Sequence, residues 1–231
     1  MKSPFKNPIC VALDVDSAQQ ALALVDQLSP IVGGFKVGPR LCLRYGEKLI
    51  EQIAKKGPVF VDNKHFDIPS TMLAAVKASY ESGASLVTVH ALSGSEALVS
   101  LAEWEAQITQ KHFFKILSVT VLTSWDESSL PASLQCWPVR EHVLSLSQEV
   151  LKSGLTGLVC SAHELELLQG RGHYLVTPGI RFVKELGSDQ KRTMGPAEAV
   201  KAGSNLLVVG RPIIEASNPE LAAADFVNSV I

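Results

Sequence analysis

Short apolar runs alternate with longer stretches of helical pattern along the chain, and this alternation limits the possible folds more than any other feature. The apolar runs predict strands at residues 9–13, 33–37, 58–63, 85–91, 113–122, 157–160, 174–177 and 205–209. Helical patterns follow them, at residues 21–28, 39–56, 70–82, 93–110, 141–153, 162–168, 196–202 and 219–230. Such a rhythm is typical of parallel βαβ units and not of hairpins.

Eight strand–helix units in a chain of 231 residues predict an α/β protein with a (βα)8 barrel, the TIM barrel, which typically needs about 250 residues. A doubly wound open sheet is the alternative, because periodicity does not tell whether the first and last strands pair. No linker of low complexity divides the chain. We therefore expect a single barrel domain over residues 1–231.

The composition excludes several classes of protein. A net charge of -2 provides no overall field for nucleic acid or an anionic membrane, so any anion must be bound locally. No stretch approaches the roughly 20 apolar residues of a membrane span, and the N-terminus has no apolar signal core. Cys10, Cys42, Cys136 and Cys160 lie far apart, which argues against a zinc site and a disulfide framework. A cytoplasmic protein that binds neither nucleic acid nor membrane is expected.

Three charged residues gather at the end of the apolar run 58–61, namely Asp62, Lys64 and Asp67. If the strand continues, its period of two places Asp62 and Lys64 on one face, with Asp67 beyond it. Buried charges are costly unless they neutralise one another. Two interpretations follow: an ion pair with Asp67 capping the helix that Pro69 begins, or a catalytic ammonium held between carboxylates.

Polar residues, together with Gly210, lie at or just after the ends of most predicted strands, where the loops of a barrel build its active site. These residues are Asp14, Lys36, Asp62, Lys64, His90, Thr123, Arg181, Gly210 and Arg211. His90 has no second histidine at ligand spacing, so we interpret it as a hydrogen-bonded structural residue in preference to a base. The histidines offer no metal pattern, and a metal-dependent reaction is disfavoured.

A phosphate site is predicted at the last two strand ends. Gly210 lets backbone N–H groups approach an anion, Arg211 can bind two oxygens at once, and barrels often bind phosphate after strands seven and eight. The segment 178–194 adds Arg181 and Gln190, and its length predicts a functional lid. The alternatives are a simple turn at Gly210 and a solvated loop at 178–194.

These residues together resemble the orotidine 5′-phosphate decarboxylase family. The most specific part is Asp62-x-Lys64-x-x-Asp67-Ile68-Pro69-x-Thr71, which is similar to the family signature. Segments 12–14, 35–38, 122–124, 177–181 and 209–211 support the resemblance, which extends over residues 9–213.

The resemblance implies a homodimeric (βα)8 barrel that converts orotidine 5′-monophosphate to uridine 5′-monophosphate and carbon dioxide without cofactor or metal. Lys64 is then the proton donor to C6 of the pyrimidine, and Lys36, Asp62 and Asp67 form an alternating array of charges around it. Asp67 and Thr71 reach into the site of the partner subunit.

The same resemblance implies how the substrate is held. Asp14 and Lys36 bind the ribose hydroxyls, and Thr123 approaches the pyrimidine. The full set of expected substrate-binding residues is Asp14, Lys36, Asp62, Lys64, Asp67, Ile68, Thr71, Thr123, Arg181, Gln190, Gly210 and Arg211, the last four binding chiefly the phosphate.

Elementary chemistry supports this expectation independently. Loss of carbon dioxide from an sp² ring carbon leaves a localised carbanion, so the site must place fixed positive charge there and supply a proton, as Lys64 can.

Two other functions compete with this interpretation. One is that of a sugar-phosphate decarboxylase or aldolase-like synthase, which shares Asp-x-Lys-x-x-Asp but uses a metal-stabilised enediolate; residues 68–71 favour the nucleotide enzyme. The other is a catalytically silent phosphoribosyl-binding protein, which the intact Lys64 and its acidic neighbours disfavour.

Overall fold

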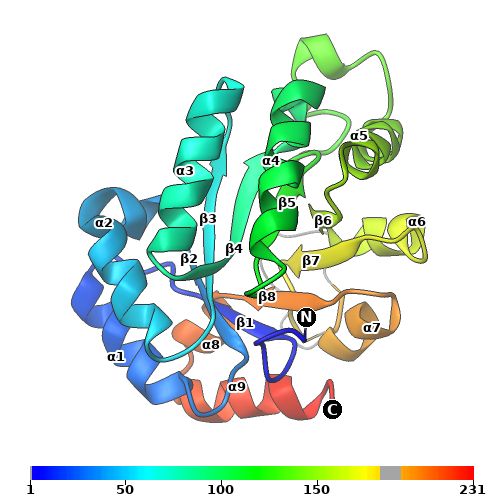
Figure 1. Cartoon of the computed structure of the whole chain (residues 1–231). Coiled ribbons are helices and arrows are strands. Elements are labelled where there is room, and N and C mark those ends of the chain that lie inside the picture. The colour runs from blue at the N-terminus through cyan, green and yellow to red at the C-terminus, as the bar shows by residue number, and fades with distance from the viewer. Residues whose placement is uncertain (1, 183–193) are drawn as a thin grey trace.

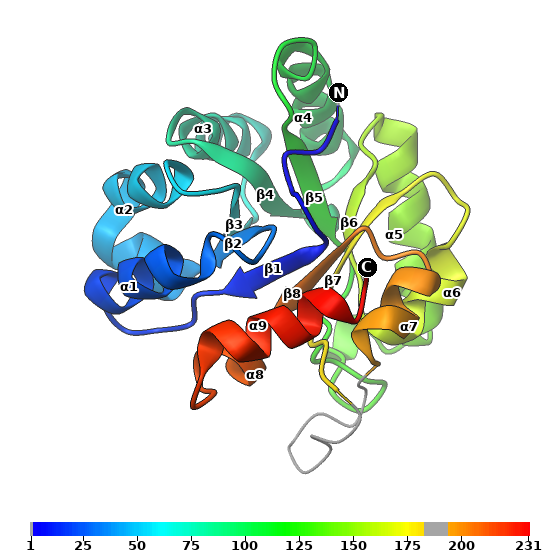
Figure 2. The same ribbon diagram turned by 90° about the horizontal axis from the view of Figure 1, so that it is seen from below.

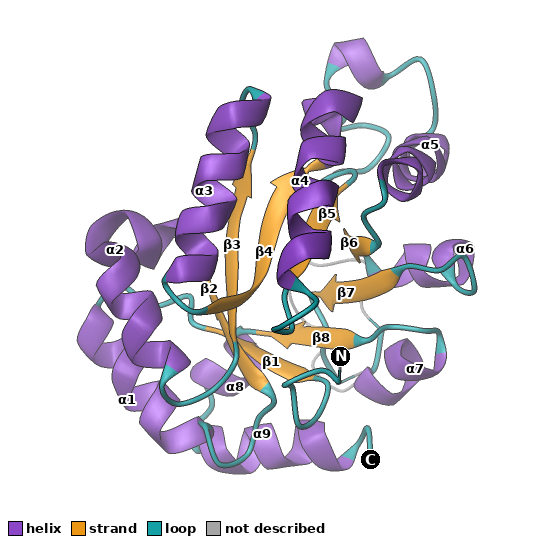
Figure 3. Ribbon diagram, viewed as in Figure 1, coloured by secondary structure: helices purple, strands orange, loops and turns teal. Residues whose placement is uncertain are grey.

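A closed barrel of parallel strands forms the centre of the molecule. The computed structural model describes residues 2–182 and 194–231, and in this part of the chain the strands lie in sequence order around the barrel (Figures 1 and 3). Their bounds are β1 Ile9–Ala12, β2 Gly34–Val37, β3 Val59–His65, β4 Ala84–His90, β5 Lys115–Val119, β6 Gly157–Val159, β7 Tyr174–Pro178 and β8 Leu206–Val209.

Closure of the barrel rests on β1, which pairs with strands on both sides. Val11 lies opposite Phe35 of β2 and opposite Val209 of β8, both in parallel register. This pairing of first and last strands excludes the open sheet, and the predicted (βα)8 barrel is confirmed.

Helices cover the outside of the barrel, and Figure 2 shows them arranged around the strands. Their bounds are α1 Ala18–Leu28, α2 Pro39–Ala54, α3 Pro69–Glu81, α4 Ser95–Ile108, α5 Val139–Ser153, α6 Leu165–Leu168, α7 Pro196–Lys201, α8 Arg211–Ile214 and α9 Pro219–Asn228. The last helix, α9, packs beside α1 and completes the ring. None of the described helices combines the length and the apolar character needed to cross a bilayer.

Two apolar layers stabilise the barrel, because successive side chains of a strand point to opposite faces. One layer fills the interior and consists of Cys10, Ala12, Phe60, Leu86, Leu117, Val119, Val159, Val176, Leu206 and Val208. The other lies between the strands and the helices, and includes Val11 and Phe35 of the neighbouring strands β1 and β2. The interior is therefore packed with apolar side chains, and the polar residues at the carboxyl ends of the strands lie directly above this layer.

Local signals explain where the first helices begin. Ser17 caps α1 by accepting a hydrogen bond from the backbone N–H of Gln20 at 3.2 Å. Pro39 begins α2 at a position where a missing N–H does no harm. Gly46 interrupts α2 with φ 59° and ψ −152°, a conformation that glycine adopts readily.

The structure differs from the sequence-based expectation at three elements. Strand β3 continues through the charged stretch to His65. After a bulge, its pairing with β4 resumes there, with His65 opposite Val89. Strand β5 is shorter than predicted, because its pairing with the short β6 ends at Val119 opposite Val159. A short helix, α8, follows β8 directly, where no helix was predicted, and Pro212 lies in its first turn.

We expect Gly157→Ala to destabilise the fold. A Cβ atom at Gly157, where β6 begins against β5, would overlap the backbone carbonyl oxygen of Ile116, and backbone cannot move aside as a flexible side chain can. The free energy of unfolding should fall by about 1 to 3 kcal/mol in urea denaturation.

Gly57→Ala is the matched control. A Cβ atom there would lie 3.7 Å from the ring of Phe35, an ordinary van der Waals contact. Its effect should stay within about 0.5 kcal/mol. Equal stability of the two variants would contradict the close approach of β5 and β6.

Candidate active site

A cavity of about 360 Å³ opens at the carboxyl ends of the strands. Its apolar wall comes from the interior layer, for example Ala12, Phe60 and Val208. Its polar lining comes from the residues at and after the ends of β1, β2, β3, β5, β7 and β8, namely Asp14, Lys36, Asp62, Lys64, Thr123, Ser124, Arg181 and Arg211. Active sites of (βα)8 barrels lie at this end.

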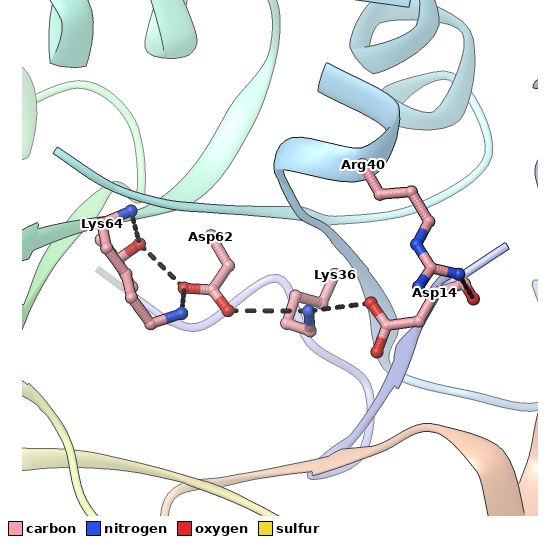
Figure 4. Close-up of polar contacts among 6 residues, drawn as sticks. Asp14, Lys36, Arg40, Asp62 and Lys64 are labelled. Carbon is pink, nitrogen blue, oxygen red and sulfur yellow. Dashed lines mark hydrogen bonds and ion pairs between the residues drawn. The ribbon is translucent and has the colours of Figure 1, made fainter. Parts of the chain in front are cut away.

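Four of these side chains form a row of alternating charge across β1, β2 and β3, which we call the charged row: Asp14, Lys36, Asp62 and Lys64 (Figure 4). Lys36 Nζ lies 3.4 Å from Asp14 Oδ1 and 3.6 Å from Asp62 Oδ2. Lys64 Nζ lies 2.9 Å from the other oxygen of Asp62, Oδ1. Within one chain, therefore, the carboxylate of Asp62 lies between the ammonium groups of Lys36 and Lys64. The sequence had suggested instead that the ammonium of Lys64 lies between the carboxylates of Asp62 and Asp67.

The environment of Asp62 favours its ionised form. Its side chain is only 15% exposed, and burial by itself would raise its pKa. The ammonium groups of Lys36 and Lys64, and hydrogen bonds from Lys64 and Thr88, outweigh burial, so the pKa of Asp62 lies below its ordinary value. Asp62 is thus a fixed negative charge inside the cavity.

Lys64 reaches Asp62 from an unusual backbone conformation. Its φ is +49°, and it is the one residue other than glycine with a positive φ in residues 2–182 and 194–231. Such a conformation costs about 1 to 3 kcal/mol. The β3–β4 register explains it: Val61 pairs with Val87 and His65 with Val89, so residues 62–64 bulge opposite a single residue of β4. Asp62 and Lys64 do meet as predicted, but through a bulge and not through a regular strand.

The single residue opposite the bulge is Thr88, which sequence reasoning missed. Its hydroxyl accepts a hydrogen bond from the backbone N–H of Lys64 at 2.9 Å and donates one to Asp62 Oδ1 at 3.0 Å. The sequence does show a polar residue, Thr88, within the apolar run that ends at His90. It does not show which residues the hydroxyl of Thr88 contacts.

Arg40 was also missed, and it supports the first member of the row. Its Nη1 donates to the backbone carbonyl of Asp14 at 3.2 Å (Figure 4). The same Nη1 lies 3.4 Å from Asp16 Oδ1. Arg44, one turn further along α2, donates to the carbonyl of Asp16 at 3.2 Å. The loop after β1 is therefore held against α2.

Asp67, Ile68 and Thr71 do not line the cavity of their own chain. All three are exposed, Ile68 at 64%. The carboxylate of Asp67 accepts a hydrogen bond from the backbone N–H of Ile68 at 2.7 Å, and the N-cap residue of α3 is Ile68. The interpretation of Asp67 as the helix cap was therefore wrong, and Asp67 does not flank Lys64 within one chain.

His90 has the surroundings of a structural residue. Its Nδ1 accepts a hydrogen bond from the backbone N–H of Leu92 at 3.3 Å, and its ring lies 5.4 Å from that of Phe66. Burial, and secondarily the charge of Lys64, lower the pKa of His90. These contacts favour the interpretation of a hydrogen-bonded residue over that of a base.

The far side of the cavity is cationic. Arg181, Gly210 and Arg211 border it as expected, and Arg211 begins α8. Gln190 and residues 183–193 of the predicted lid, which spans 178–194, lie outside the described residues. Among the lining residues that are described, four cations face two carboxylates, so the cavity suits an anionic ligand.

Metal ligands are not grouped in the described ranges. Residues 2–182 and 194–231 contain no cluster of three or more histidine, cysteine, aspartate and glutamate side chains that could hold an ion. Lys36 and Lys64 instead engage the two oxygens of Asp62.

Comparisons with known proteins agree on one family. Residues 7–226 match the sequence profile described as "Orotidine 5′-phosphate decarboxylase / HUMPS family". A protein of Chromobacterium violaceum named orotidine 5′-phosphate decarboxylase is 42% identical, over 100% of this chain and 94% of the relative. One of the same name from Vibrio cholerae is 39% identical over 96% of this chain and 98% of the relative. The crystal structure of orotidine 5′-phosphate decarboxylase from Lactobacillus acidophilus has a TM-score of 0.84 at 33% identity, covering 97% of this chain and 99% of that one.

We expect Asp62→Asn to destabilise the protein at pH 7 by about 1 to 3 kcal/mol, because two ammonium groups then lose the carboxylate between them. The folded-state pKa of Asp62 is lowered, so its contribution to stability is present above the unfolded-state pKa, about 4, and is lost as pH falls through the folded value. The difference in unfolding free energy between wild type and variant should therefore narrow from pH 7 to about pH 3 in urea denaturation.

Asp26→Asn is the matched control. Asp26 lies 2.7 Å from Lys56, but both side chains are more than half exposed, at 62% and 53%. Its loss should cost less than about 0.5 kcal/mol. An Asp62→Asn effect that does not change with pH, or one no larger than the control, would contradict the described electrostatics.

Proposed function

The chain belongs to the orotidine 5′-phosphate decarboxylase / HUMPS family, and we propose that Lys64 donates the proton in a cofactor-free conversion of orotidine 5′-monophosphate to uridine 5′-monophosphate and carbon dioxide. This activity is that of a carboxy-lyase in pyrimidine biosynthesis. One observation carries the proposal: the ammonium of Lys64, held 2.9 Å from Asp62, lines a cavity whose described lining is predominantly cationic.

The substrate has two anionic ends, and the cavity offers cations for both. We place the phosphate at Arg181, Gly210 and Arg211, with Gln190 as a further ligand, because barrels commonly bind phosphate after the seventh and eighth strands. The ribose hydroxyls then face Asp14 and Lys36. The pyrimidine lies between Thr123 and Lys64, with C6 toward the ammonium.

The reaction breaks the bond between C6 and the carboxylate carbon. Carbon dioxide leaves without the bonding electrons, and the pair stays on C6 as a carbanion in the plane of the ring. The ammonium of Lys64 stabilises this charge as it develops. One N–H proton of Lys64 then passes to C6, and the amine recovers a proton from solvent.

Asp62 and Lys36 prepare Lys64 for this role. Asp62 fixes the ammonium in one place before the substrate arrives, and Lys36 engages its other oxygen at 3.6 Å. A charge that is already oriented does not have to reorganise during the reaction, which is the main source of electrostatic catalysis.

The proposed enzyme is a homodimer in which Asp67 and Thr71 of each subunit reach into the site of the other. Their exposure outside the cavity of their own chain supports this arrangement. Two large apolar side chains that flank Asp67 in the sequence are also exposed, Phe66 at 62% and Ile68 at 64%. Exposed apolar side chains grouped in this way mark a protein contact.

We also propose that the whole chain, residues 1–231, is one barrel domain that works in the cytoplasm. All four cysteines are free thiols, and Cys10 and Cys160 are buried. Free buried thiols suit a reducing compartment.

The activity test follows the loss of the ultraviolet absorption of orotidine 5′-monophosphate. Wild type should decarboxylate it, and Lys64→Ala should lose roughly 10⁵-fold or more in kcat, because both a general acid and a fixed cation disappear. The fold should persist, as circular dichroism and binding of uridine 5′-monophosphate can show.

Lys111→Ala is the control substitution, at an exposed lysine in the turn after α4, and it should keep the wild-type rate. Addition of EDTA or magnesium ions distinguishes the proposed activity from that of a metal-dependent sugar-phosphate enzyme. Neither addition should change the rate of the proposed decarboxylation. Absence of wild-type turnover under every condition would reject the activity, and full turnover by Lys64→Ala would reject the role of Lys64.

Shared sites predict that two inactive variants complement each other. In a heterodimer of Asp67→Asn and Lys36→Ala subunits, the site on the Asp67→Asn chain keeps its own Lys36 and receives an intact Asp67 from the partner. Co-refolding equal amounts should therefore restore about one site in four.

A mixture of Lys36→Ala and Lys64→Ala subunits is the matched control, because both residues belong to the same chain's site and no intact site can form. No gain in activity in the first mixture, or an equal gain in both, would count against shared sites.

A further inference from the structure

Thr88 lies inside the barrel, directly against the charged row. It is completely buried in β4, two residues after Leu86 of the interior layer. Its hydroxyl contacts two members of the row, Asp62 and Lys64, yet it does not line the cavity itself. It can therefore act on the reaction only through these neighbours.

Chemistry decides the direction of both hydrogen bonds. The backbone N–H of Lys64 can only donate, so the hydroxyl oxygen of Thr88 accepts at 2.9 Å. An ionised Asp62 can only accept, so the hydroxyl proton points to Oδ1 at 3.0 Å. Lys64 Nζ approaches the same Oδ1 at 2.9 Å, which closes a ring of contacts through one lysine, one carboxylate and one hydroxyl.

The hydroxyl occupies a gap in the strand ladder. Pairing between β3 and β4 stops at Val61 opposite Val87 and resumes at His65 opposite Val89. A buried backbone N–H in such a gap needs another acceptor. Thr88 supplies it to Lys64, the residue whose φ is +49°.

The hydroxyl also sets the orientation of the carboxylate. With Oδ1 engaged by Thr88 and Lys64, Oδ2 faces Lys36 at 3.6 Å. Rotation of the carboxylate would break the contact with Thr88 and move Asp62 relative to both ammonium groups. One buried hydroxyl thus constrains the backbone of Lys64 and the side chain of Asp62 together.

We propose that Thr88 is a positioning residue for the decarboxylation, holding the backbone of Lys64 and the carboxylate of Asp62 so that the ammonium is aimed at the substrate. This inference rests on the proposed function of Lys64 as proton donor. It adds a requirement for a hydroxyl at a residue that does not line the cavity.

The test compares Thr88→Val, which keeps the shape but removes the hydroxyl, with Thr88→Ser, which keeps the hydroxyl. Misplacement of a catalytic group by about 1 Å can cost about 100-fold, so kcat of Thr88→Val should fall by about that factor. KM should change less than about threefold, because the proposed ribose and phosphate contacts are elsewhere. Thr88→Ser should recover kcat to within about fivefold of wild type, since serine offers the same donor and acceptor.

Thr120→Val is the matched control. Thr120 is 1% exposed just after β5, and its hydroxyl has no hydrogen-bond partner among the residues described. The same change of atoms there should leave kcat and KM at wild-type values. If Thr88→Val does not fold, Thr88→Ala replaces it, because the smaller side chain fits the same space and the same loss of kcat is expected.

A crystal structure of the variant without the hydroxyl provides a readout independent of turnover. The separation of Lys64 Nζ and Asp62 Oδ1 should exceed about 3.5 Å, beyond hydrogen-bond distance. An unchanged contact and an unchanged positive φ at Lys64 would overturn the proposal, as would a kcat within about threefold of wild type or a Thr88→Ser variant as slow as Thr88→Val. Lack of turnover by wild type would instead overturn the proposed function.

Discussion

The carboxylate of Asp62 is the interaction on which the site depends. Each of its oxygens faces a different ammonium, Lys64 at 2.9 Å and Lys36 at 3.6 Å. Two ammonium groups enclosed this closely would be unfavourable if the carboxylate between them were missing, because burial removes much of their hydration. The mutual neutralisation of the three charges lets a largely apolar barrel carry fixed charge at its open end, and the lowered pKa of Asp62 is the electrostatic sign of that balance.

The barrel makes this arrangement rigid. The charged row takes its members from three adjacent strands or the residues just after them, and parallel pairing sets their relative heights, with Lys36 opposite Ala12 on one side and Phe60 on the other. The packed interior layer beneath, from Cys10 to Val208, supports the row from the opposite side. The strands thus hold Lys36, Asp62 and Lys64, to which the proposed function assigns the central roles, more rigidly than loops would.

Much of this architecture could be predicted from the sequence, and the exceptions share a cause. Repeated apolar runs predict the barrel, and parallel strands bring Asp14, Lys36, Asp62 and Lys64 to one rim whatever the details of packing. The bulge at Lys64 could not be predicted, because two extra residues preserve the alternation of side chains. The partners of Thr88 depend on how β3 and β4 align across 26 residues of sequence. The outward position of Asp67 was ambiguous, since a helix start and a catalytic motif use the same residues.

The left-handed backbone at Lys64 has a consequence for how this position tolerates change over evolution. Glycine and asparagine adopt a positive φ with less strain than lysine does, so selection for folding alone would favour them at residue 64. The proposed role of Lys64 as proton donor, in contrast, requires a lysine there. Under that proposal the two requirements oppose each other at one residue, and the strained backbone of Lys64 lowers stability in exchange for activity.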